Sequence, residues 1–410
     1  MRRALSTSLP DRLPDAEWRN RDGLDQLYAA LGAPDGEARF VGGAVRDGLL
    51  GLPVKDIDIA TIHAPETVVE RIKAAGFKAV PTGIEHGTVT AVVHHRPVEI
   101  TTLRRDVSTD GRRATVAFGT DWREDAARRD FTINALYADP ADGTLLDFFG
   151  GLDDLAEGRV RFIGDPVARI AEDHLRILRY FRFTARFGTI DRASADYAAC
   201  VTHATSLMAL SRERIADELL KLLALPDPAP VIAAMVEDGV LAAILPEVTA
   251  QGVLALKALI TAEVALAIEP DAIRRLIALL PPDPVAADQI GARLRFSKKL
   301  RARMQTALTP VEVGTVEGLA YRIGTTGAID QSLLGRAFSV EDAKRLETWT
   351  APRLPLSGGD LIAMGLPAGP LVARTLYDVE SDWIAAGFPP VDAAKALAAQ
   401  RVAVALRSSQ

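Results

Sequence analysis

The chain has 410 residues, of which 48% are hydrophobic and 25% are charged, and its formal net charge is −6. That length exceeds one ordinary domain and fits two or three, and the composition is typical of a globular protein. A single cysteine, Cys200, excludes an internal disulfide framework and a zinc cluster. No apolar run reaches the ~18 residues of a membrane span, and we expect no signal peptide and a cytoplasmic protein. The negative net charge argues against whole-surface attraction to nucleic acid, although it leaves room for local basic patches.

The first part of the chain predicts alternating short helices and strands. After a leader and one helix, the pattern favours strand, glycine turn, helix, strand, helix and two further strands. In order, these expected elements are a helix near 23–31, a strand at 39–41, a helix at 44–50, a strand at 55–60, a helix at 66–75, and strands at 88–94 and 97–103. Such a mixture indicates an α+β domain.

The stretch from Phe40 to Ala60 carries the strongest chemical signal. Asp56 and Asp58 are separated by one apolar residue, so in an extended strand both side chains point to the same face. Two carboxylates that close repel each other unless a cation lies between them, and hard oxygen ligands suit Mg²⁺. The preceding pair Gly42-Gly43 allows close backbone approach to a phosphate at the start of a helix. The stretch therefore predicts metal-dependent phosphoryl or nucleotidyl transfer.

Two polar segments follow the last of these strands. The segment 104–124 is interpreted as a mobile loop or a loose hairpin. The run 127–136 is expected to open a helix, with Asp130 stabilising its positive end. A final short strand is expected at 145–148, and Gly150-Gly151 indicates a domain boundary.

From Asp165 onward the pattern is helical throughout. Asp165-Pro166 is a favourable helix start, and the helix is expected to continue to Gly188. In such a helix Asp173 and Arg176 lie one turn apart, which alone fits a surface ion pair as well as a binding site. Ser211 is expected to cap the next helix. Later helices are expected at 211–224, 230–238, 254–268, 271–280, 284–294 and 298–308, with no strand beyond about residue 165.

Three motifs in this order resemble one enzyme family. They are GGAVRDGLLG followed by DID, then RRDFTINAL, then EDHLRILRYFRF. Together they resemble the class II, or bacterial-type, tRNA nucleotidyltransferase and poly(A) polymerase family over about residues 35–225. The resemblance implies a polymerase β-like nucleotidyltransferase head with a mixed antiparallel sheet, followed by an all-α neck, body and tail. It also suggests domains at 1–150, 151–225 and 226–410.

The resemblance also implies roles for individual residues. Catalysis and the binding of two Mg²⁺ ions fall to Asp56 and Asp58, with Glu99 as a third catalytic carboxylate. The triphosphate lies against Gly42 and Gly43, and the same motif continues with Arg46 and Asp47. The implied nucleotide-binding residues of the later motifs are Arg128, Arg129, Asp130, Asn134, Asp173, Arg176 and Arg179.

Within that motif set, two assignments stay open. For Glu99 the spacing alone is weak evidence, because a glutamate on a strand is more often a solvated residue than a metal ligand. Arg179, with Arg182 and Arg186, forms either salt bridges within the neck or contacts to RNA.

The implied activity is addition of CCA to the 3′ end of tRNA from CTP and ATP. Adding only A and poly(A) synthesis share this framework, and the full-length segment 104–124 favours complete CCA addition over CC addition. The sequence also leaves open a non-catalytic RNA-binding homologue and a small-molecule nucleotidyltransferase. The expected partners are tRNA and nucleoside triphosphates, with no obligate protein partner and no membrane. The basic run 293–303 is either a phosphate track or a solvated helix face.

Overall fold

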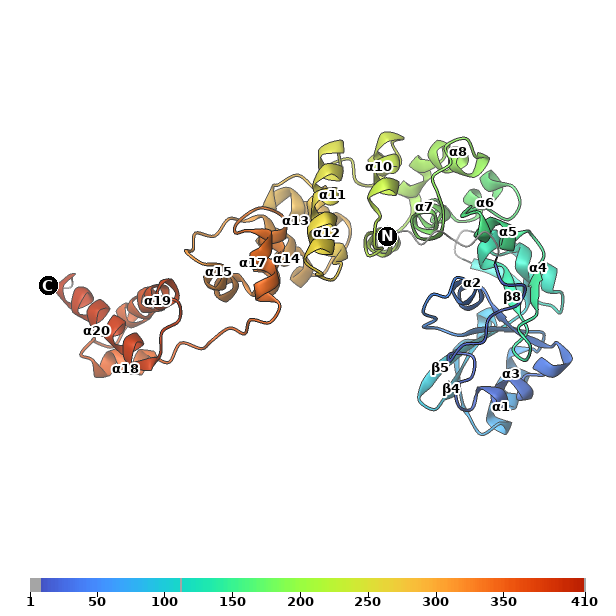
Figure 1. The fold of residues 1–410 in the computed structure, drawn as a ribbon, viewed down its shortest axis with the longest axis horizontal. Helices are drawn as coiled ribbons and strands as arrows, with labels where there is room; N and C mark the ends of the chain where they lie inside the picture. Colours follow the sequence, from blue (N-terminus) through green and yellow to red (C-terminus); the bar gives the residue numbers. More distant parts are fainter. Residues whose placement is uncertain (1–8, 111–112, 409–410) are drawn as a thin grey trace. The chain divides into compact units, whose positions relative to one another are not determined.

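The computed structural model describes residues 9–110 and 113–408, and the backbone alone is described for residues 105–110, 113–116 and 408. The chain divides into two compact units, Met1–Ile244 and Leu245–Gln410. Figure 1 colours the first unit blue to yellow-green and the second yellow to red. The division lies inside the segment expected to form body and tail, and the expected boundaries at 150 and 225 stay predictions.

The first unit is built on a mixed seven-stranded sheet in the order β3-β4-β5-β2-β1-β8-β9, with β6 and β7 as a separate hairpin. Only the β2–β5 pair of this sheet is parallel. The strands are β1 (Ala38–Val41), β2 (Asp58–Thr61), β3 (Lys78–Gly83), β4 (Thr88–Val93), β5 (Arg96–Thr102), β6 (Arg104–Asp110), β7 (Arg113–Phe118), β8 (Leu136–Ala138) and β9 (Leu145–Asp147). The hairpin interpretation of 104–124 is therefore confirmed, whereas β3 and β8 were not predicted.

Helices alternate with the strands of this sheet, and after β9 the described elements of the unit are all helices or 3₁₀ turns. The α-helices of the first unit are α1 (Leu24–Ala30), α2 (Gly43–Leu49), α3 (Pro65–Ala74), α4 (Trp122–Ala127), α5 (Gly151–Ala156), α6 (Pro166–Glu172), α7 (Arg176–Phe187), α8 (Ala195–Thr202), α9 (Arg212–Leu223) and α10 (Ala229–Glu237). Short 3₁₀ turns are η1 (Ala33–Asp35), η2 (Ile84–His86), η3 (Thr132–Asn134), η4 (Ala204–Ala209) and η5 (Leu241–Ala243). The α+β class is confirmed, and no strand follows β9 in the residues that the structure describes.

Two sequence predictions were wrong. The run 127–136 is not a helix, because α4 ends at Ala127 and a 3₁₀ turn leads into β8. Tertiary bonds occupy its backbone instead: Thr132 N donates to Arg161 O at 3.0 Å, and Ile163 N donates to Asp130 O at 3.2 Å. The helix expected over 165–188 is also interrupted, since Asp173 is extended (φ −152°, ψ 106°) and separates α6 from α7.

Aromatic side chains pack between the strand-rich part and the helices that follow it. The Phe131 ring lies 4.9 Å from Phe162 and 5.2 Å from Phe183, and Phe162 stacks on Tyr180 at 5.9 Å between centroids. Aromatic pairs of this kind contribute roughly 0.5–1.5 kcal/mol each beyond their buried area. Phe131, which lies between α4 and β8, and Phe162, which lies after α5, therefore share one core with helix α7.

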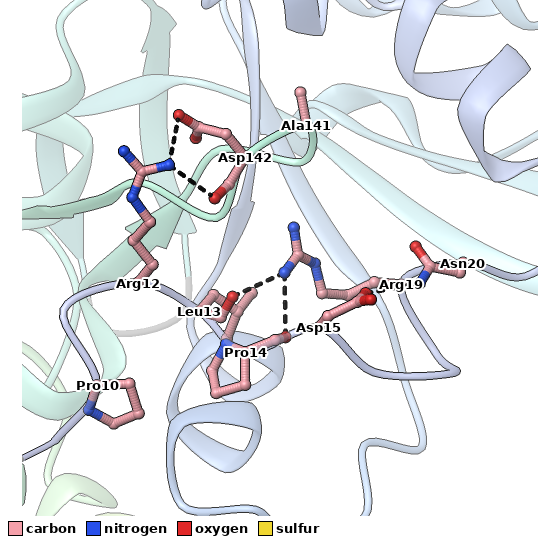
Figure 2. Close-up of a pocket in the computed structure, with 9 residues that line it drawn as sticks. All are labelled: Pro10, Arg12, Leu13, Pro14, Asp15, Arg19, Asn20, Ala141 and Asp142. Atoms are coloured by element: carbon pink, nitrogen blue, oxygen red, sulfur yellow. Dashed lines mark hydrogen bonds and ion pairs between the residues drawn. The ribbon is translucent and has the colours of Figure 1, made fainter.

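The segment before α1 lies against the turn between β8 and β9. Leu13 N donates to Gly143 O at 2.8 Å, and Arg12 pairs with Asp142 at 3.2 Å. The buried Arg19 guanidinium donates to the carbonyls of Leu13 and Pro14 (Figure 2). These residues line a hollow of about 570 Å³. Its wall contains none of the predicted site residues.

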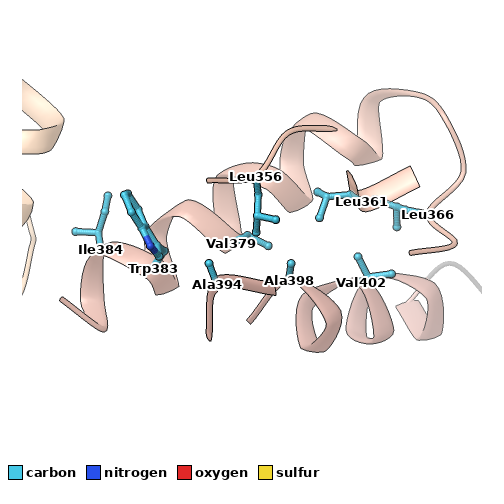
Figure 3. Close-up of a cluster of buried hydrophobic side chains, with 9 residues drawn as sticks. All are labelled: Leu356, Leu361, Leu366, Val379, Trp383, Ile384, Ala394, Ala398 and Val402. Carbon is cyan, nitrogen blue, oxygen red and sulfur yellow. The ribbon is translucent and has the colours of Figure 1, made fainter. Parts of the chain in front are cut away.

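The second unit is entirely helical in its described residues. Its helices are α11 (Ala250–Ala265), α12 (Ala272–Leu279), α13 (Pro284–Arg293), α14 (Lys298–Leu308), α15 (Val316–Ile323), α16 (Thr325–Leu333), α17 (Val340–Leu346), α18 (Gly358–Ala363), α19 (Pro370–Ala385) and α20 (Val391–Ser408). The last three share a core in which Trp383 and Val379 of α19 face Ala394 and Ala398 of α20 (Figure 3). No described helix of the chain is long and apolar enough to cross a membrane.

The basic run 293–303 is partly neutralised in this unit. Three of its arginines form ion pairs, Arg293 with Glu247, Arg301 with Asp288 and Arg303 with Asp330. Arg295, Lys298 and Lys299 are exposed and have no ion pair within the described residues. The phosphate track stays a prediction and rests on these three side chains.

A buried ionic network joins four helices of the second unit. Glu263 on α11 accepts from Arg274 Nη1 and Arg275 Nε of α12, both at 2.9 Å. Arg274 Nε also donates to Asp330 of α16 at 2.9 Å, and Asp330 accepts from Arg303 of α14 at 2.8 Å. Glu263 and Asp330 are almost completely buried. Removing one charge from such a network leaves its partners uncompensated in a low dielectric.

We expect Glu263→Gln to lower the free energy of unfolding of the second unit by ~3 kcal/mol, because two buried guanidinium groups lose their shared carboxylate. Urea unfolding followed by tryptophan fluorescence measures the change. The matched control is Glu347→Gln in the Lys344–Glu347 pair at the surface of the same unit, for which we expect less than ~0.5 kcal/mol. Equal effects of the two substitutions would contradict the importance of the network.

Candidate active site

The turn at Gly42-Gly43 connects β1 to α2 in a conformation that favours glycine. Gly42 has φ 66° and ψ −120°, and its N–H donates to Leu136 O at 2.9 Å. A Cβ at this position would lie 3.3 Å from Arg129 Nη1 and 3.4 Å from Asn134 O. The missing side chain thus lets the β1–α2 turn approach the segment that carries Arg129 and Asn134.

The two aspartates lie at the start of the central strand β2. The expected strand begins later than predicted, at Asp58, and Asp56 lies in the bend before it. Ile57 and Ile59 are buried, while Asp56 is exposed and Asp58 is partly buried. On the parallel neighbour β5, Glu99 is the register partner of Asp58. The strand pairing therefore brings the third predicted carboxylate beside the second.

The carboxylate of Asp58 is in an unfavourable electrostatic environment. The pKa of Asp58 is raised to about 6, chiefly by burial and next by the negative charge of Glu99, while the positive charge of Arg129 opposes the shift. Within the described residues, Asp56, Asp58 and Glu99 have no hydrogen-bond or ion-pair partner on their side chains. A bound cation would relieve this repulsion.

These residues fit Mg²⁺ through the chemistry of their donors. In residues 9–110 and 113–408, no group of three or more histidine, cysteine or acidic side chains is arranged to hold a metal ion. Mg²⁺ commonly takes only one or two carboxylates and completes its octahedron with water and substrate phosphates. Asp56 and Asp58 supply such a pair of oxygen ligands.

The two arginines after α4 are anchored by one buried aspartate. Asp125 accepts from Arg128 Nε at 2.9 Å, from Arg129 Nη2 at 3.1 Å and from the Tyr137 hydroxyl at 2.7 Å. Burial raises the pKa of Asp125, but the charges of Arg129 and Arg128 outweigh it and hold that pKa below its usual value. The carboxylate is thus ionised and fixes both side chains. The spacing of Asp125 to Arg128 and Arg129, three and four residues, could have indicated this pairing from the sequence.

A continuous hydrogen-bond network connects three of the predicted motifs. Asp130 accepts from Asn134 Nδ2 at 2.9 Å and from Arg179 Nε at 2.8 Å. Asn134 Oδ1 in turn accepts from Arg46 Nη1, and Arg46 Nε donates to Asp47 at 2.9 Å. The network therefore runs from α2 through η3 to α7.

The helix α7 closes this network at a second point. Arg186 Nη2 donates to Asp47 Oδ2 at 2.9 Å, so the acidic residue next to Arg46 is also held by the neck. The Arg46 guanidinium lies 4.2 Å from the Phe187 ring and 5.3 Å from the Phe183 ring. The sequence left open whether Arg179 and Arg186 form salt bridges or contact RNA. Both form ion pairs between the strand-rich part and α7.

The break between α6 and α7 separates two of the predicted nucleotide-binding residues, Asp173 and Arg176. Asp173 and Arg176 do not pair with each other through their side chains. Asp173 Oδ2 accepts from Arg214 Nη2 of α9 at 2.6 Å, whereas Arg176 Nη1 donates to Glu172 Oε2 at 2.5 Å. The simple surface ion pair is therefore wrong, and each side chain is held by a separate partner.

One cavity of about 470 Å³ gathers most of the predicted site residues. It is lined by Gly42, Gly43, Arg46, Asp58, Arg129, Asp130, Asn134, Asp173, Arg176, Arg179 and Phe183. Four predicted residues do not line it: Asp47, Asp56, Glu99 and Arg128. Asp47 instead accepts a hydrogen bond from Arg46, which lines the wall. Arg128 shares the carboxylate of Asp125 with Arg129, which also lines the wall.

The supporting residues of this cavity were missed on sequence grounds. Glu172 precedes Arg176 by four residues, which is a helical pairing distance that could have been recognised. Arg214 lies on a separate helix, and no local pattern connects it with Asp173. Phe183 of α7 also lines the cavity and was not among the predicted site residues.

Family models match two parts of the chain. Residues 38–161 match the "Poly A polymerase head domain", and residues 195–251 match the "Probable RNA and SrmB- binding site of polymerase A". The fold and the site thus define a nucleotidyltransferase head of the poly(A) polymerase type followed by helices.

Similar proteins narrow this class to one family. The CCA-adding enzyme of Lacticaseibacillus paracasei is 34% identical over 364 residues, which cover 86% of this chain and 89% of that protein. The human mitochondrial CCA tRNA nucleotidyltransferase 1 is 45% identical over 215 residues, or 51% of this chain and 49% of that protein. The crystal structure of the Bacillus stearothermophilus CCA-adding enzyme in complex with CTP matches 90% of this chain and 94% of its own, with a TM-score of 0.66 and 26% identity.

The chain belongs to the class II CCA-adding enzyme family. The matches to the human, mouse and zebrafish relatives span about half the length of those proteins.

The raised pKa of Asp58 predicts a stability gain for Asp58→Asn. The folded-state pKa lies above the usual value, so the native state holds the proton more tightly than the unfolded state does. The cost of the charged carboxylate is absent below about pH 4 and develops fully as the pH rises past about 6. In EDTA at about pH 7.5, we expect Asp58→Asn to be more stable than the native protein by ~1–2 kcal/mol.

Urea unfolding in EDTA at about pH 4 and about pH 7.5 measures this difference, and near pH 4 the two proteins should have similar midpoints. Addition of Mg²⁺ at the higher pH should stabilise the native protein more than the variant. A native protein that is the more stable of the two in EDTA at the higher pH would contradict the proposed repulsion.

The geometry of Gly42 predicts that Gly42→Ala loses both stability and phosphate binding. The substitution places a methyl group against Arg129 and Asn134 in a backbone conformation that L-residues rarely adopt, and we expect it to cost ~2–3 kcal/mol of stability. Gly51→Ala is the matched control, because Gly51 also has positive φ (64°) but no atom lies within 4 Å of the added methyl group. We expect only Gly42→Ala to weaken binding of inorganic tripolyphosphate, as measured by calorimetry. Equal losses of binding in the two variants would contradict the role of close approach at Gly42.

Proposed function

We propose that this chain adds CCA to the 3′ end of tRNA from CTP and ATP, by template-independent nucleotidyl transfer that depends on Mg²⁺. The observation that carries the proposal is the cavity whose wall combines Gly42-Gly43, Asp58 and the Asp173/Arg176 pair. Membership of the CCA-adding enzyme family supports the same activity. The cysteine content and the family suit a reducing compartment, and we propose the cytoplasm.

The strand-rich part of the cavity binds the phosphate end of the substrate. Gly42 and Gly43 present backbone without side chains, so a triphosphate can approach the main chain closely. Arg129 contributes a guanidinium that Asp125 already orients, which reduces the entropy lost on binding. Arg46, nearly buried, holds Asn134 and Asp47 and thereby fixes the turn.

Asp56 and Asp58 are the residues that would hold Mg²⁺, with Glu99 beside them as a further carboxylate. Bound there, Mg²⁺ supplies a lowered pKa for the attacking 3′-hydroxyl and charge neutralisation for the triphosphate and the leaving pyrophosphate. The task of the protein residues is then to position the reactants and to complement their charge.

Selection of the base falls to Asp173 and Arg176. Asp173 is an acceptor and Arg176 a donor, and both lie on the cavity wall. Because Arg214 and Glu172 hold them separately, their spacing does not depend on a mutual ion pair. An acceptor and a donor at fixed positions match the Watson–Crick edges of cytosine and adenine, and they leave buried polar groups unpaired against uracil or guanine. Since protein side chains supply both groups, no nucleic-acid template is needed.

Sequencing the products made on tRNA that lacks its 3′ CCA tests the proposal directly. With CTP, ATP and Mg²⁺ we expect a CCA end. A-only products or long A tracts would instead identify an A-adding enzyme or a poly(A) polymerase. Asp56→Ala provides the inactive control, because it removes an exposed candidate metal ligand without disturbing the core. Normal tRNA binding by the native protein without any incorporation would contradict the enzymatic function and favour a non-catalytic RNA-binding protein.

A further inference from the structure

Arg169 is a nearly buried arginine on α6 that lies outside the cavity wall and contacts both halves of the site. Its Nη2 donates to the backbone carbonyl of Arg128 at 2.6 Å and to that of Arg129 at 2.5 Å. Its Nη1 donates to both carboxylate oxygens of Glu172, at 3.0 and 2.7 Å. One guanidinium therefore joins the backbone of the phosphate-binding segment to the carboxylate that holds Arg176.

Arg176 depends on the same two residues. Its Nη1 donates to Glu172 Oε2 at 2.5 Å and to the backbone carbonyl of Arg169 at 2.7 Å. Its Nε and Nη2 have no hydrogen-bond partner within residues 9–110 and 113–408, and Arg176 lines the cavity. Glu172 is thus shared between two arginines, and part of the Arg176 guanidinium is left available for a base.

We infer that Arg169 is a positioning residue that fixes the distance and orientation between the phosphate-binding segment at Arg128-Arg129 and the base-selecting Arg176. The inference rests on the proposed function of this cavity. Arg169 acts through two connections, since it binds the backbone that carries Arg129 and it occupies Glu172. The planar fork of a guanidinium is suited to this, because it can donate to two carbonyls and a carboxylate at once.

Charge balance explains what the absence of Arg169 would do. With Arg169 present, Glu172 divides its two oxygens between two cations. Without it, Glu172 can bind Arg176 through both oxygens and withdraw the donors that a base requires. The carbonyls of Arg128 and Arg129 would lose their donor at the same time, so the segment would be free to shift. A ligand that spans both halves of the site should therefore suffer more than one that occupies the phosphate half alone.

The test compares CTP, which spans both halves, with inorganic tripolyphosphate, which occupies only one. Calorimetry in Mg²⁺ gives the dissociation constants for the native protein and for Arg169→Met, Arg169→Lys and Arg19→Met. Arg19 is the matched control, because it is also a nearly buried arginine that donates to backbone carbonyls, of Leu13, Pro14 and Pro140, but it does not line the cavity. Thermal unfolding of each variant establishes that it is folded at the temperature of the titration.

We expect the ratio of the CTP constant to the tripolyphosphate constant to rise about tenfold in Arg169→Met, which corresponds to ~1.4 kcal/mol. Arg169→Lys should give an intermediate ratio, since one ammonium group cannot reach all of these acceptors. The preference for CTP over UTP should fall in parallel. Arg19→Met should lose stability but keep the native ratio.

An unchanged ratio in a folded Arg169→Met or Arg169→Lys, while the native protein prefers CTP to UTP, would overturn the inference and leave the proposed function intact. A native protein that binds CTP no more tightly than tripolyphosphate would overturn the base-selecting site itself, and the inference with it.

Discussion

The buried carboxylate of Asp130 is the constraint on which the rest of the site depends. It is 9% exposed, and an ionised carboxylate with so little water requires several donors. Burial raises the pKa of Asp130, but Arg179, Asn134 and the Phe131 N–H together hold it below its usual value. Those donors come from the segment after α4 and from α7. Asp130 can therefore stay ionised only when the segment after α4 and helix α7 both place their donors against its carboxylate.

The other charges of the cavity follow from this arrangement. Each cation on the wall is held by an acidic partner: Arg46 by Asp47, Arg129 by Asp125, Arg176 by Glu172 and Arg179 by Asp130. Asp173 is paired with Arg214. In the part of the chain that the structure describes, Asp58 is the one wall residue whose charge has no ion-pair partner. The cavity thus lacks one cation beside Asp58, and a metal ion that accompanies a triphosphate would supply it.

Local signals in the sequence predicted the parts of the site that depend on local geometry. The glycine pair, the alternation of Asp56, Ile57 and Asp58, and the place of Glu99 on a strand all depend on neighbouring residues. The resemblance to the family then supplied the roles of Arg129, Asp130, Asn134 and Arg176, which no spacing alone could give. The structure brings most of these residues to one cavity wall.

What could not be predicted depends on distant partners. The amphipathic pattern of 165–188 contains no proline after Pro166 and no glycine before Gly188, so a continuous helix was the natural expectation. The break at Asp173 coincides with a tertiary pair to Arg214, forty-one residues away, and with the bond from Leu175 N to the Asp173 carboxylate. Likewise, 127–136 has helical composition, but bonds to Arg161 and Ile163 occupy its backbone groups. In both segments tertiary contacts outweigh helix propensity, which amounts to only ~0.7 kcal/mol per residue or less.

The Asp130–Arg179 pair offers the most direct test of the claim that the phosphate-binding segment and the neck helix act as one unit. A double-mutant cycle with Asp130→Ala, Arg179→Ala and the double variant, read out by CTP affinity, measures their coupling. We predict a coupling free energy of ~1.5 kcal/mol or more, so that the double variant binds CTP about as well as either single variant. Single effects that simply add in the double variant would contradict the account.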